Sequence, residues 1–72
     1  MNHKKYIIKV ERPNGKAAYL KNVSTMGGLT LTYRPNGARK FRWMDQASSV
    51  RSDMARFFET GTVMHIIEWV GA

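Results

Sequence analysis

The fold is decided by the stretch YIIKVERPNGKAAYL, residues 6–20, in which two runs of alternating apolar residues flank the tetrapeptide Arg-Pro-Asn-Gly. In that tetrapeptide proline fixes φ at the first turn position, asparagine tolerates the second, and glycine accepts a positive φ at the third. This turn chemistry is typical of a three-residue hairpin loop that closes on a glycine bulge. The sequence therefore predicts a β-hairpin in which Arg12 pairs with Lys16.

The register of this hairpin gathers apolar side chains on one face. The pairs on the apolar face are Val10 with Ala18, Ile8 with Leu20 and Tyr6 with Asn22. The pairs on the other face are Glu11 with Ala17, Lys9 with Tyr19 and Ile7 with Lys21. One apolar and one mixed face is the pattern of an antiparallel sheet that is buried on one side.

The same tetrapeptide recurs at residues 34–37 and predicts a second hairpin, in which Arg34 pairs with Ala38. The pairs on its apolar face are Leu31 with Phe41, Leu29 with Trp43 and Tyr33 with Arg39. The pairs on the opposite face are Thr32 with Lys40 and Thr30 with Arg42. A slip of one residue would scatter the apolar set, so the pattern favours this register.

The period of the apolar residues changes after Asp45, which we expect to cap a helix. The apolar positions of this helix form a single stripe of Ala47, Val50, Met54, Phe57 and Phe58. Gly61 fits the left-handed position just past the helix end. Residues 62–70 then alternate again with both sets mostly apolar, which predicts an interior strand or one partly covered on its second face.

The resulting order is four strands, a helix and a final strand, in a single domain that covers residues 1–72 with residues 1–4 flexible. The predicted fold class is α+β, an antiparallel sheet of four to five strands (two hairpins, ββββαβ) with the helix packed on one face. If the helix crosses the apolar face, the last strand returns antiparallel beside the first, in the spatial order 5-1-2-3-4. The alternative is a right-handed crossover that places the last strand beside the fourth.

Residues for catalysis or metal binding are not gathered in this sequence. The five acids are dispersed, so the sequence suggests no pair of carboxylates that would flank a substrate. His65 lies between apolar neighbours in the last strand, where a lone histidine is a sheet residue, and the chain has no cysteine. We therefore expect a protein that is not an enzyme and needs no metal or cofactor. The apolar run after Lys4-Lys5 is too short for a signal peptide, so we expect a cytoplasmic location and no membrane partner.

The charge of the chain is unevenly distributed. Twelve lysines and arginines against five acids give a net charge of +7 at neutral pH. Residues 1–44 contain ten of the basic side chains and one acid, whereas residues 45–72 contain two basic side chains and four acids. The positive charge therefore belongs to the predicted hairpins.

The predicted pairing places many of these cations on the sheet face turned away from the helix. The candidate nucleic-acid-binding residues are Lys9, Tyr19, Lys21, Thr30, Thr32, Lys40 and Arg42 on that face and Arg12, Lys16 and Arg34 at the loop ends. Cations neutralise phosphates, Tyr19 can stack on a base, and threonine hydroxyls can donate to phosphate oxygens. These residues predict a non-enzymatic module that binds nucleic acid through the open sheet face. The alternative is a solvated face that keeps a small protein soluble.

Two resemblances extend this prediction. A basic three-stranded sheet backed by a helix, over residues 6–58, is similar in topology to the amino-terminal DNA-binding domains of phage-type integrases, which read the major groove with the sheet. The run Ala38-Arg39-Lys40-Phe41, a helix that opens near Ala47 and a final strand of Val-Met-His-Ile-Ile type resemble short accessory proteins of bacteriophages and prophages, including anti-CRISPR inhibitors. The second resemblance implies an alternative function, in which the protein binds and inhibits or modulates a host protein. The expected partner is therefore nucleic acid or an acidic protein, and the expected state is a monomer or a homodimer.

Overall fold

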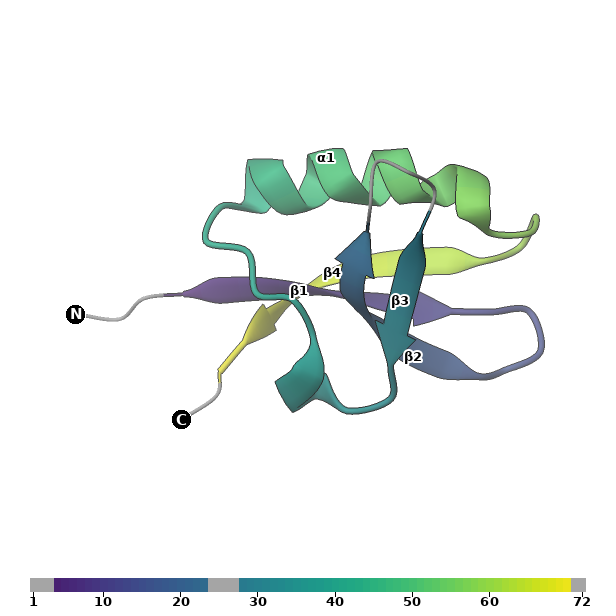
Figure 1. Cartoon of the computed structure of the whole chain (residues 1–72), viewed down its shortest axis with the longest axis horizontal. Coiled ribbons are helices and arrows are strands. Elements are labelled where there is room, and N and C mark those ends of the chain that lie inside the picture. The colour runs from purple at the N-terminus through teal and green to yellow at the C-terminus, as the bar shows by residue number, and fades with distance from the viewer. Residues whose placement is uncertain (1–3, 24–27, 71–72) are drawn as a thin grey trace.

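The computed structural model describes residues 4–23 and 28–70, which form one α-helix and four strands (Figure 1). The elements in chain order are β1 (Lys5–Glu11), β2 (Ala17–Val23), β3 (Leu29–Thr32), the 3-10 helix η1 (Pro35–Gly37), α1 (Met44–Met54), the 3-10 helix η2 (Ala55–Phe57) and β4 (Val63–Trp69). The α+β class is confirmed, with the sheet at the lower end of the predicted strand number. Of the four residues expected to be flexible, residues 1–3 lie outside the described ones.

The four strands form one antiparallel sheet in the order β3-β2-β1-β4. β4 runs beside β1 along its whole length, from Lys5 opposite Trp69 to Glu11 opposite Val63. The predicted return of the last strand beside the first is thus confirmed. Of the two alternatives predicted for this strand, the interior position is wrong, because β4 lies at the edge of the sheet, and the partly covered second face is correct. Its outer face is only partly covered, with Ile67 36% exposed and Trp69 half-buried.

The β1–β2 hairpin has the predicted loop. The Arg12 amide donates to the Lys16 carbonyl at 3.0 Å, and the Gly15 amide donates to the Arg12 carbonyl at 3.0 Å. Gly15 has a φ of +85°, the left-handed conformation that the turn requires. Pairing then follows the predicted register as far as Lys9 opposite Tyr19.

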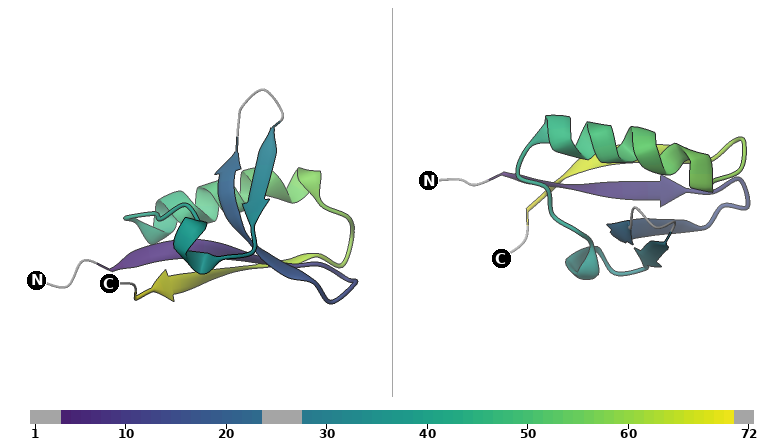
Figure 2. Two further views of the ribbon diagram at one scale, coloured as in Figure 1. Left: turned by 60° about the horizontal axis from the view of Figure 1, so that its bottom comes forward. Right: turned by 45° about the horizontal axis from the view of Figure 1, so that its top comes forward.

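Beyond Tyr19 the two strands of this hairpin separate, and the pairs predicted further along are wrong (Figure 2). β2 passes to β3 instead, where Leu20 pairs with Leu31, and a register shift follows between Leu20 and Asn22. Irregularities of this kind bend a strand and increase its local twist, so it turns away from its neighbour. The pairs that the structure replaces are Ile8 with Leu20, Ile7 with Lys21 and Tyr6 with Asn22.

The second Arg-Pro-Asn-Gly does not form a hairpin. It forms η1, in which the Gly37 amide donates to the Arg34 carbonyl at 3.0 Å. Gly37 does not adopt a positive φ, so the glycine bulge that closes the first loop has no counterpart here. The predicted pairing of the following segment with β3 is therefore wrong.

The chain after η1 joins β1 instead of β3. Phe41 and Tyr6 exchange two backbone hydrogen bonds, of 2.7 and 2.8 Å, and the Arg39 amide donates to the Leu20 carbonyl at 2.8 Å. This segment fills the wedge that opens where β2 turns away, and it satisfies backbone groups that β2 leaves free. It contributes a single bridge to β1 in place of the predicted fourth strand.

α1 begins just before the predicted position. Trp43 is the N-cap residue, without a side-chain hydrogen bond, and its carbonyl accepts the Ala47 amide at 3.1 Å. The expectation that Asp45 caps the helix is wrong. Its carboxylate lies in the first turn, where it interacts favourably with the helix dipole.

The predicted helix reaches Phe58, but α1 ends at Met54 and η2 at Phe57. Gly61 has a φ of +96°, so its left-handed conformation is confirmed, but it lies in the turn before β4 and not just past the helix end. Across residues 4–23 and 28–70, no helix has the length and apolar character needed to cross a membrane.

One hydrophobic core lies between α1 and the sheet. Its fully buried members are Ile8, Val10, Leu20, Phe41, Ala47 and Met54. The predicted helix stripe is completed by the partly buried Val50, Phe57 and Phe58, which pack against this core. Figure 2 shows α1 lying along β1 and β4 on this side of the sheet. Phe41 therefore belongs to the predicted core although its predicted strand does not form.

Candidate nucleic-acid interface

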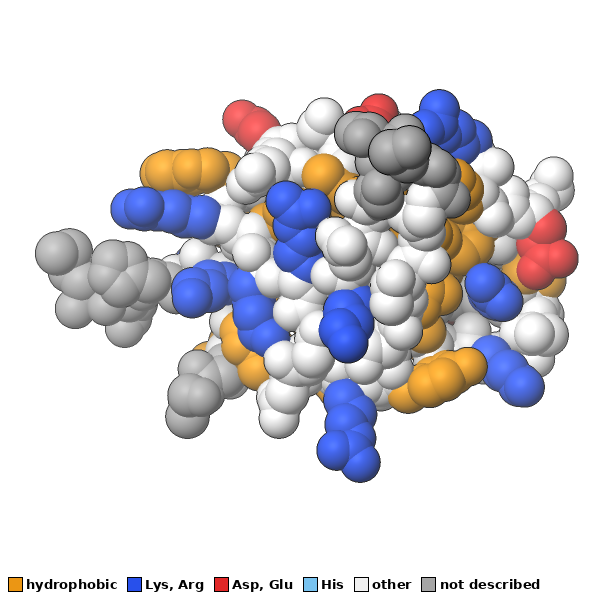
Figure 3. Space-filling model, viewed as in Figure 1, with side chains coloured by type: hydrophobic (Ala, Val, Ile, Leu, Met, Phe, Trp, Pro, Cys, Tyr) orange, Lys and Arg blue, Asp and Glu red, His pale blue; other side chains and the backbone are white. Residues whose placement is uncertain are grey.

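Basic side chains are spread over the face of the molecule that carries β2, β3 and η1 (Figure 3). In this view acidic side chains appear only at the margins, beside α1 and toward the turn that leads into β4. The uneven charge of the sequence is thus also an uneven charge of the surface. The ten predicted residues are divided among a row across the sheet, a turn, a groove and the outer rim of β2 and β3.

Lys9, Tyr19 and Thr32 form a row across three strands. Lys9 lies opposite Tyr19, and Tyr19 lies opposite Thr32, on the face turned away from α1 as predicted. His65 extends the row on β4, where it lies opposite Lys9. The Thr32 hydroxyl oxygen accepts the Arg34 amide at 3.2 Å, so part of its hydrogen-bonding capacity is used by the turn that follows β3.

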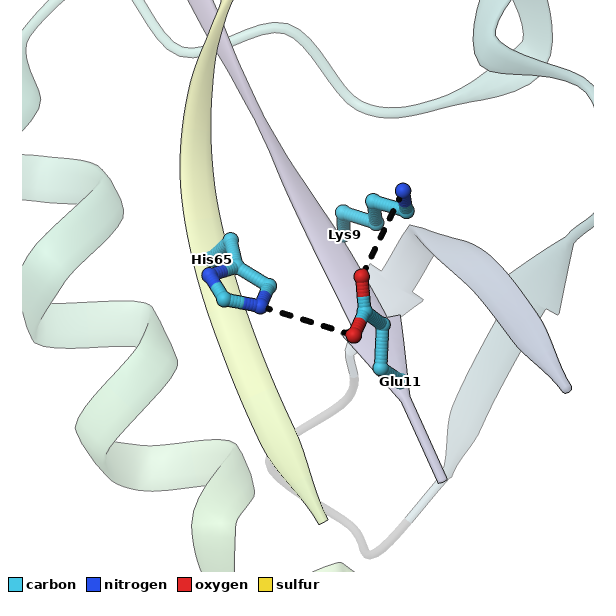
Figure 4. Close-up of polar contacts among 3 residues, drawn as sticks. All are labelled: Lys9, Glu11 and His65. Atoms are coloured by element: carbon cyan, nitrogen blue, oxygen red, sulfur yellow. Dashed lines mark ion pairs between the residues drawn. The ribbon is translucent and has the colours of Figure 1, made fainter. Parts of the chain in front are cut away.

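Glu11 neutralises part of this row (Figure 4). Its Oε1 lies 3.4 Å from Nζ of Lys9, and its Oε2 lies 3.8 Å from Nε2 of His65. The three side chains are 33–47% exposed, and an ion pair this close to solvent, such as Lys9–Glu11, contributes about 0–1 kcal/mol to stability. Lys9 is therefore half-buried and already paired, which makes it a weak candidate for contacting phosphate.

Lys40 is held within the protein's own structure. Its Nζ donates to the carbonyl of Asn36 and, at 3.0 Å, to that of Ala38, and it lies 5.0 Å from the centre of the Trp69 ring. The ring quadrupole attracts an ammonium group placed over the indole. Because Trp69 belongs to β4 and Asn36 to η1, this cation holds η1 against the outer face of the sheet. Ile7 lies on that face and is 1% exposed, so the face is closed over the middle of β1.

A groove of about 760 Å³ lies at the amino end of β1. Its lining residues are Lys4, Lys5, Tyr6, Lys40, Arg42, Trp43 and Met44. Trp43 is 62% exposed, and the guanidinium carbon of Arg42 lies 5.2 Å from the centre of a Trp43 ring. Lys4 lies 3.5 Å from the Glu68 carboxylate, whereas Lys5 and Arg42 have no ion-pair partner among the residues that the structure describes. The groove thus combines unpaired positive charge with an exposed indole.

Most residues of this groove are missed by sequence reasoning, since only Lys40 and Arg42 are among those predicted. The others join them because Phe41 bridges to Tyr6, which brings the amino end of β1 beside the chain that leads into α1. Trp43, expected on the apolar face of a hairpin, is exposed because that hairpin does not form. The signal that could have indicated the groove is the dipeptide Arg42-Trp43, a cation beside a large aromatic residue in a basic stretch.

The remaining predicted residues lie on other parts of the basic surface. On or beside β2 and β3, the exposed residues are Lys21, Thr30 and Arg34. Arg12 and Lys16 flank the β1–β2 turn, where the guanidinium carbon of Arg12 lies 5.5 Å from the centre of the Phe58 ring. These residues add positive charge to the surface but do not line the groove.

The groove and the surface around it offer cations, an indole and hydroxyl groups. Within the described segments no group of three or more His, Cys, Asp and Glu side chains is placed to hold a metal ion. Comparison of the chain with protein-family models, with curated proteins and with solved structures finds no match.

Proposed function

We propose that this protein is a non-enzymatic module that binds single-stranded nucleic acid, with the contact centred on the groove at the amino end of β1. The observation that carries the proposal is the convergence of Lys4, Lys5 and Arg42 with the exposed indole of Trp43. The basic residues on the face drawn in Figure 3 would extend the contact beyond the groove.

The positive charge favours a polyanionic partner. Each phosphate that a lysine or arginine neutralises releases condensed counterions, which makes binding favourable and dependent on salt. Lys5 and Arg42 are exposed, and among the described side chains neither has an acidic partner. Both therefore keep their charge for phosphate contacts, in contrast to Lys9 and Lys40.

The exposed indole favours an unpaired strand over a duplex. Bases of a single strand can stack on an aromatic side chain, and each such stack contributes about 1–3 kcal/mol to binding. Bases of a duplex are already stacked on one another, and they are read from the grooves by a helix or a β-ribbon. Trp43 is not part of such an element, because it lies on the short connection between η1 and α1. Arg42 beside the ring adds a planar cation that can contact either phosphate or base.

Fluorescence anisotropy with a labelled single strand of about twelve nucleotides tests the proposal, since one site of this kind spans about 4–16 nucleotides. We expect micromolar binding at about 50 mM salt, with a log–log salt slope of about −3 for roughly four phosphate contacts. A duplex of the same length should bind more weakly. Absence of binding to either nucleic acid at low salt would contradict the proposal.

Variants of the groove locate the contact. Lys5→Glu combined with Arg42→Glu should weaken binding at least about tenfold by removing phosphate contacts. Trp43→Ala should weaken it by about 5-fold to 150-fold through loss of one stacked base. The matched control is Arg39→Glu combined with Arg56→Glu, which changes the net charge equally at exposed residues outside the groove and outside the predicted binding residues. Equal losses in the two double variants would mean that net charge alone drives binding, and the groove assignment would be wrong.

A second candidate function is that of an accessory protein that binds and modulates a host protein. One separate observation favours it, because Tyr33 is 77% exposed just after β3, outside the groove. Exposed tyrosine is enriched where proteins contact each other. A complex recovered from lysate after nuclease digestion, and lost in Tyr33→Ser, would support this function. If every association is removed by nuclease, the second function is excluded.

A further inference from the structure

The outer edge of β4 presents backbone groups that no segment in the described part of the chain pairs with. Tyr6 exchanges its backbone hydrogen bonds with Phe41, and Arg12 bonds to Lys16, so the even-numbered residues of β1 direct their amides and carbonyls away from β4. These directions alternate in an antiparallel ladder, so the odd-numbered residues of β1 bond to β4. Their partners on β4 are Val63, His65, Ile67 and Trp69. The residues whose amides and carbonyls point outward are therefore Met64, Ile66 and Glu68.

This edge has few of the features that usually prevent strands from pairing, and Glu68 is its one charged side chain apart from His65. β4 is seven residues long, keeps a regular register against β1, and has the sequence VMHIIEW, without proline, lysine or arginine. Edge strands are commonly protected by those residues or by a bulge. Val63, which is 48% exposed, and Ile67 add apolar surface on the outer face of the strand.

We propose that β4 pairs with β4 of a second copy of this chain, antiparallel and centred on Ile66, to form a symmetric dimer. Residues whose backbone amides and carbonyls point outward must lie opposite residues of the same kind in the partner strand. A two-fold axis at Ile66 meets this condition, because it places Met64 opposite the partner's Glu68. Axes at His65 or Ile67 would also satisfy the backbone. Ile66 is the midpoint of Val63–Trp69, so only this axis pairs the strand over its full length.

The side chains suit this register. On the outer face the exposed Val63 would lie opposite the partner's half-buried Trp69, and His65 opposite the partner's exposed Ile67, so each exposed apolar side chain of the strand is covered by a ring. Both helices would lie on one side of the joined sheet and both basic faces on the other. α1 lies over β1 and β4, so two strand spacings of about 4.8 Å place the helices about 10 Å apart, a normal packing distance.

A groove of about 470 Å³ between α1 and β4 supplies the charge complementarity of the dimer. Its lining residues are Met44, Asp45, Ser48, Arg51, Met64, His65 and Ile66. Met64 and Ile66 pack against the core, so even-numbered residues of β4 face α1, and the partner's Glu68 would project toward this groove. α1 runs antiparallel to β4, which places Arg51 toward the Met64 end (Figure 1). Arg51 would therefore meet the partner's Glu68, and Arg51 has no ion-pair partner within the described residues. Glu68 lies 3.5 Å from Nζ of Lys4 in its own chain, in an exposed pair that the dimer would exchange for Arg51 or share with it.

This pairing selects a second copy over another extended segment, because one chain carries both Arg51 and Glu68. Each dimer would contain two such ion pairs, related by the two-fold axis. Asp45 also lines the groove, but at 1.5 Å per residue it lies about 9 Å along α1 from Arg51. Asp45 is therefore too distant to pair with Arg51 in place of the partner's Glu68.

Sedimentation equilibrium without nucleic acid tests the dimer independently of the proposed function. Across loading concentrations of about 1 to 200 µM, we expect the mass to rise from 8.3 kDa toward twice that value, which places the dissociation constant in the micromolar range. A chain that remains monomeric over this range would overturn the proposal.

Charge reversal tests the predicted ion pair. Glu68→Arg or Arg51→Glu alone should weaken the dimer at least about tenfold, because each places like charges together. The double variant should restore the affinity, since the pair is re-formed with its signs exchanged. The matched controls are Glu59→Arg and Arg56→Glu, which make the same charge changes at exposed residues outside β4 and its groove. If the double variant is as weak as the single ones, Arg51 and Glu68 do not pair.

The absence of cysteine from the chain allows a direct test of register. Ile66→Cys places a thiol on the axis, opposite its own copy, at the Cα separation of about 5.5 Å that a disulfide accepts. His65→Cys places the thiol opposite the partner's Ile67, so that two such thiols are too far apart to bond. Under oxidation we expect a covalent dimer from the first variant alone. Equal cross-linking of both variants, or of neither while both remain folded by circular dichroism, would overturn the register.

Discussion

At the scale of single residues, the surroundings of each lysine decide whether its charge serves the fold or a partner. Nζ of Lys40 is occupied by two carbonyl groups of the η1 region and by the Trp69 ring, whereas Lys5 is exposed at the rim of the groove. Both carry the same charge in the sequence. Their roles differ because one ammonium group has protein acceptors within reach and the other has none among the described residues.

Lys40→Met separates these roles experimentally. Methionine keeps much of the aliphatic stem but removes the donors and the charge, so we expect the free energy of unfolding to fall by about 1–3 kcal/mol. Lys21→Met makes the same charge change at an exposed position and should alter it by less than about 0.5 kcal/mol. Urea denaturation followed by tryptophan fluorescence measures both variants. Equal stability of the two would mean that Lys40 does not hold η1 to the sheet.

At the scale of elements, two copies of one tetrapeptide form two different turns. The Arg-Pro-Asn-Gly of the β1–β2 loop uses a left-handed glycine, while the copy at η1 forms a 3-10 turn in which Gly37 does not have a positive φ. Gly15→Ala should therefore lower the free energy of unfolding by about 1–2 kcal/mol, the usual cost of a left-handed alanine. The space around Gly15 is open, so this cost is one of backbone conformation alone.

Gly37→Ala is the comparison for that prediction. An added Cβ would lie 3.2 Å from the Thr32 hydroxyl oxygen, which a small side-chain movement can relieve, so the loss should be less than half that of Gly15→Ala. Thermal or urea denaturation of both variants measures the difference. Equal losses would mean that the second turn also needs glycine for its backbone, against the conformation described above.

The same contrast explains how much of the fold the sequence predicts. The first loop and the pairs nearest to it depend on local turn chemistry and alternation, and they are correct. The second hairpin is wrong because the pairing of the segment around Phe41 depends on a distant part of the sheet. β2 separates from β1, and this leaves Tyr6 free to pair with Phe41. The helix stripe and the core position of Phe41 are nevertheless predicted, since burial follows the apolar pattern whichever strand is the neighbour.

The residues of the candidate site likewise fall into a part that local pattern predicts and a part that depends on distant pairing. The shared face of Lys9, Tyr19 and Thr32 is predicted because it needs only the register close to the first turn and the alternation along the strands, whereas the pairing of Tyr19 with Thr32 is not. The groove is not predicted, because Lys5 and Trp43 become neighbours only through the bridge between Tyr6 and Phe41. Ion pairs between side chains, such as that of Glu11 with Lys9, likewise cannot be predicted from the pattern of apolar and charged residues along the chain.

At the scale of the whole molecule, the net charge of +7 is confined to a body whose radius of gyration is 11.9 Å. At about 10 mM salt the Debye length is about 30 Å, so every charge acts on every other, whereas at about 150 mM it falls to about 8 Å. Net repulsion opposes the compact state and is thus strongest at low salt. The described ion pairs are few and exposed, and they offset little of it. We expect the melting temperature to rise by several degrees between these salt concentrations, where about 1 kcal/mol corresponds to 4–8 °C.

The same charges predict the opposite salt dependence for a bound nucleic acid, whose affinity falls as counterions compete for phosphate. Added salt also lowers the repulsion between two copies and so favours pairing of β4. Thermal scans should therefore use a concentration at which the chain is monomeric, so that the melting temperature reports the stability of the single chain alone. Lys21→Glu combined with Arg34→Glu brings the net charge closer to zero and should flatten the rise of the melting temperature. A melting temperature that falls with added salt would mean that ion pairs such as Lys9–Glu11 outweigh net repulsion. The positive side chains would then stabilise the fold through ion pairs, and they would not be available to bind a partner.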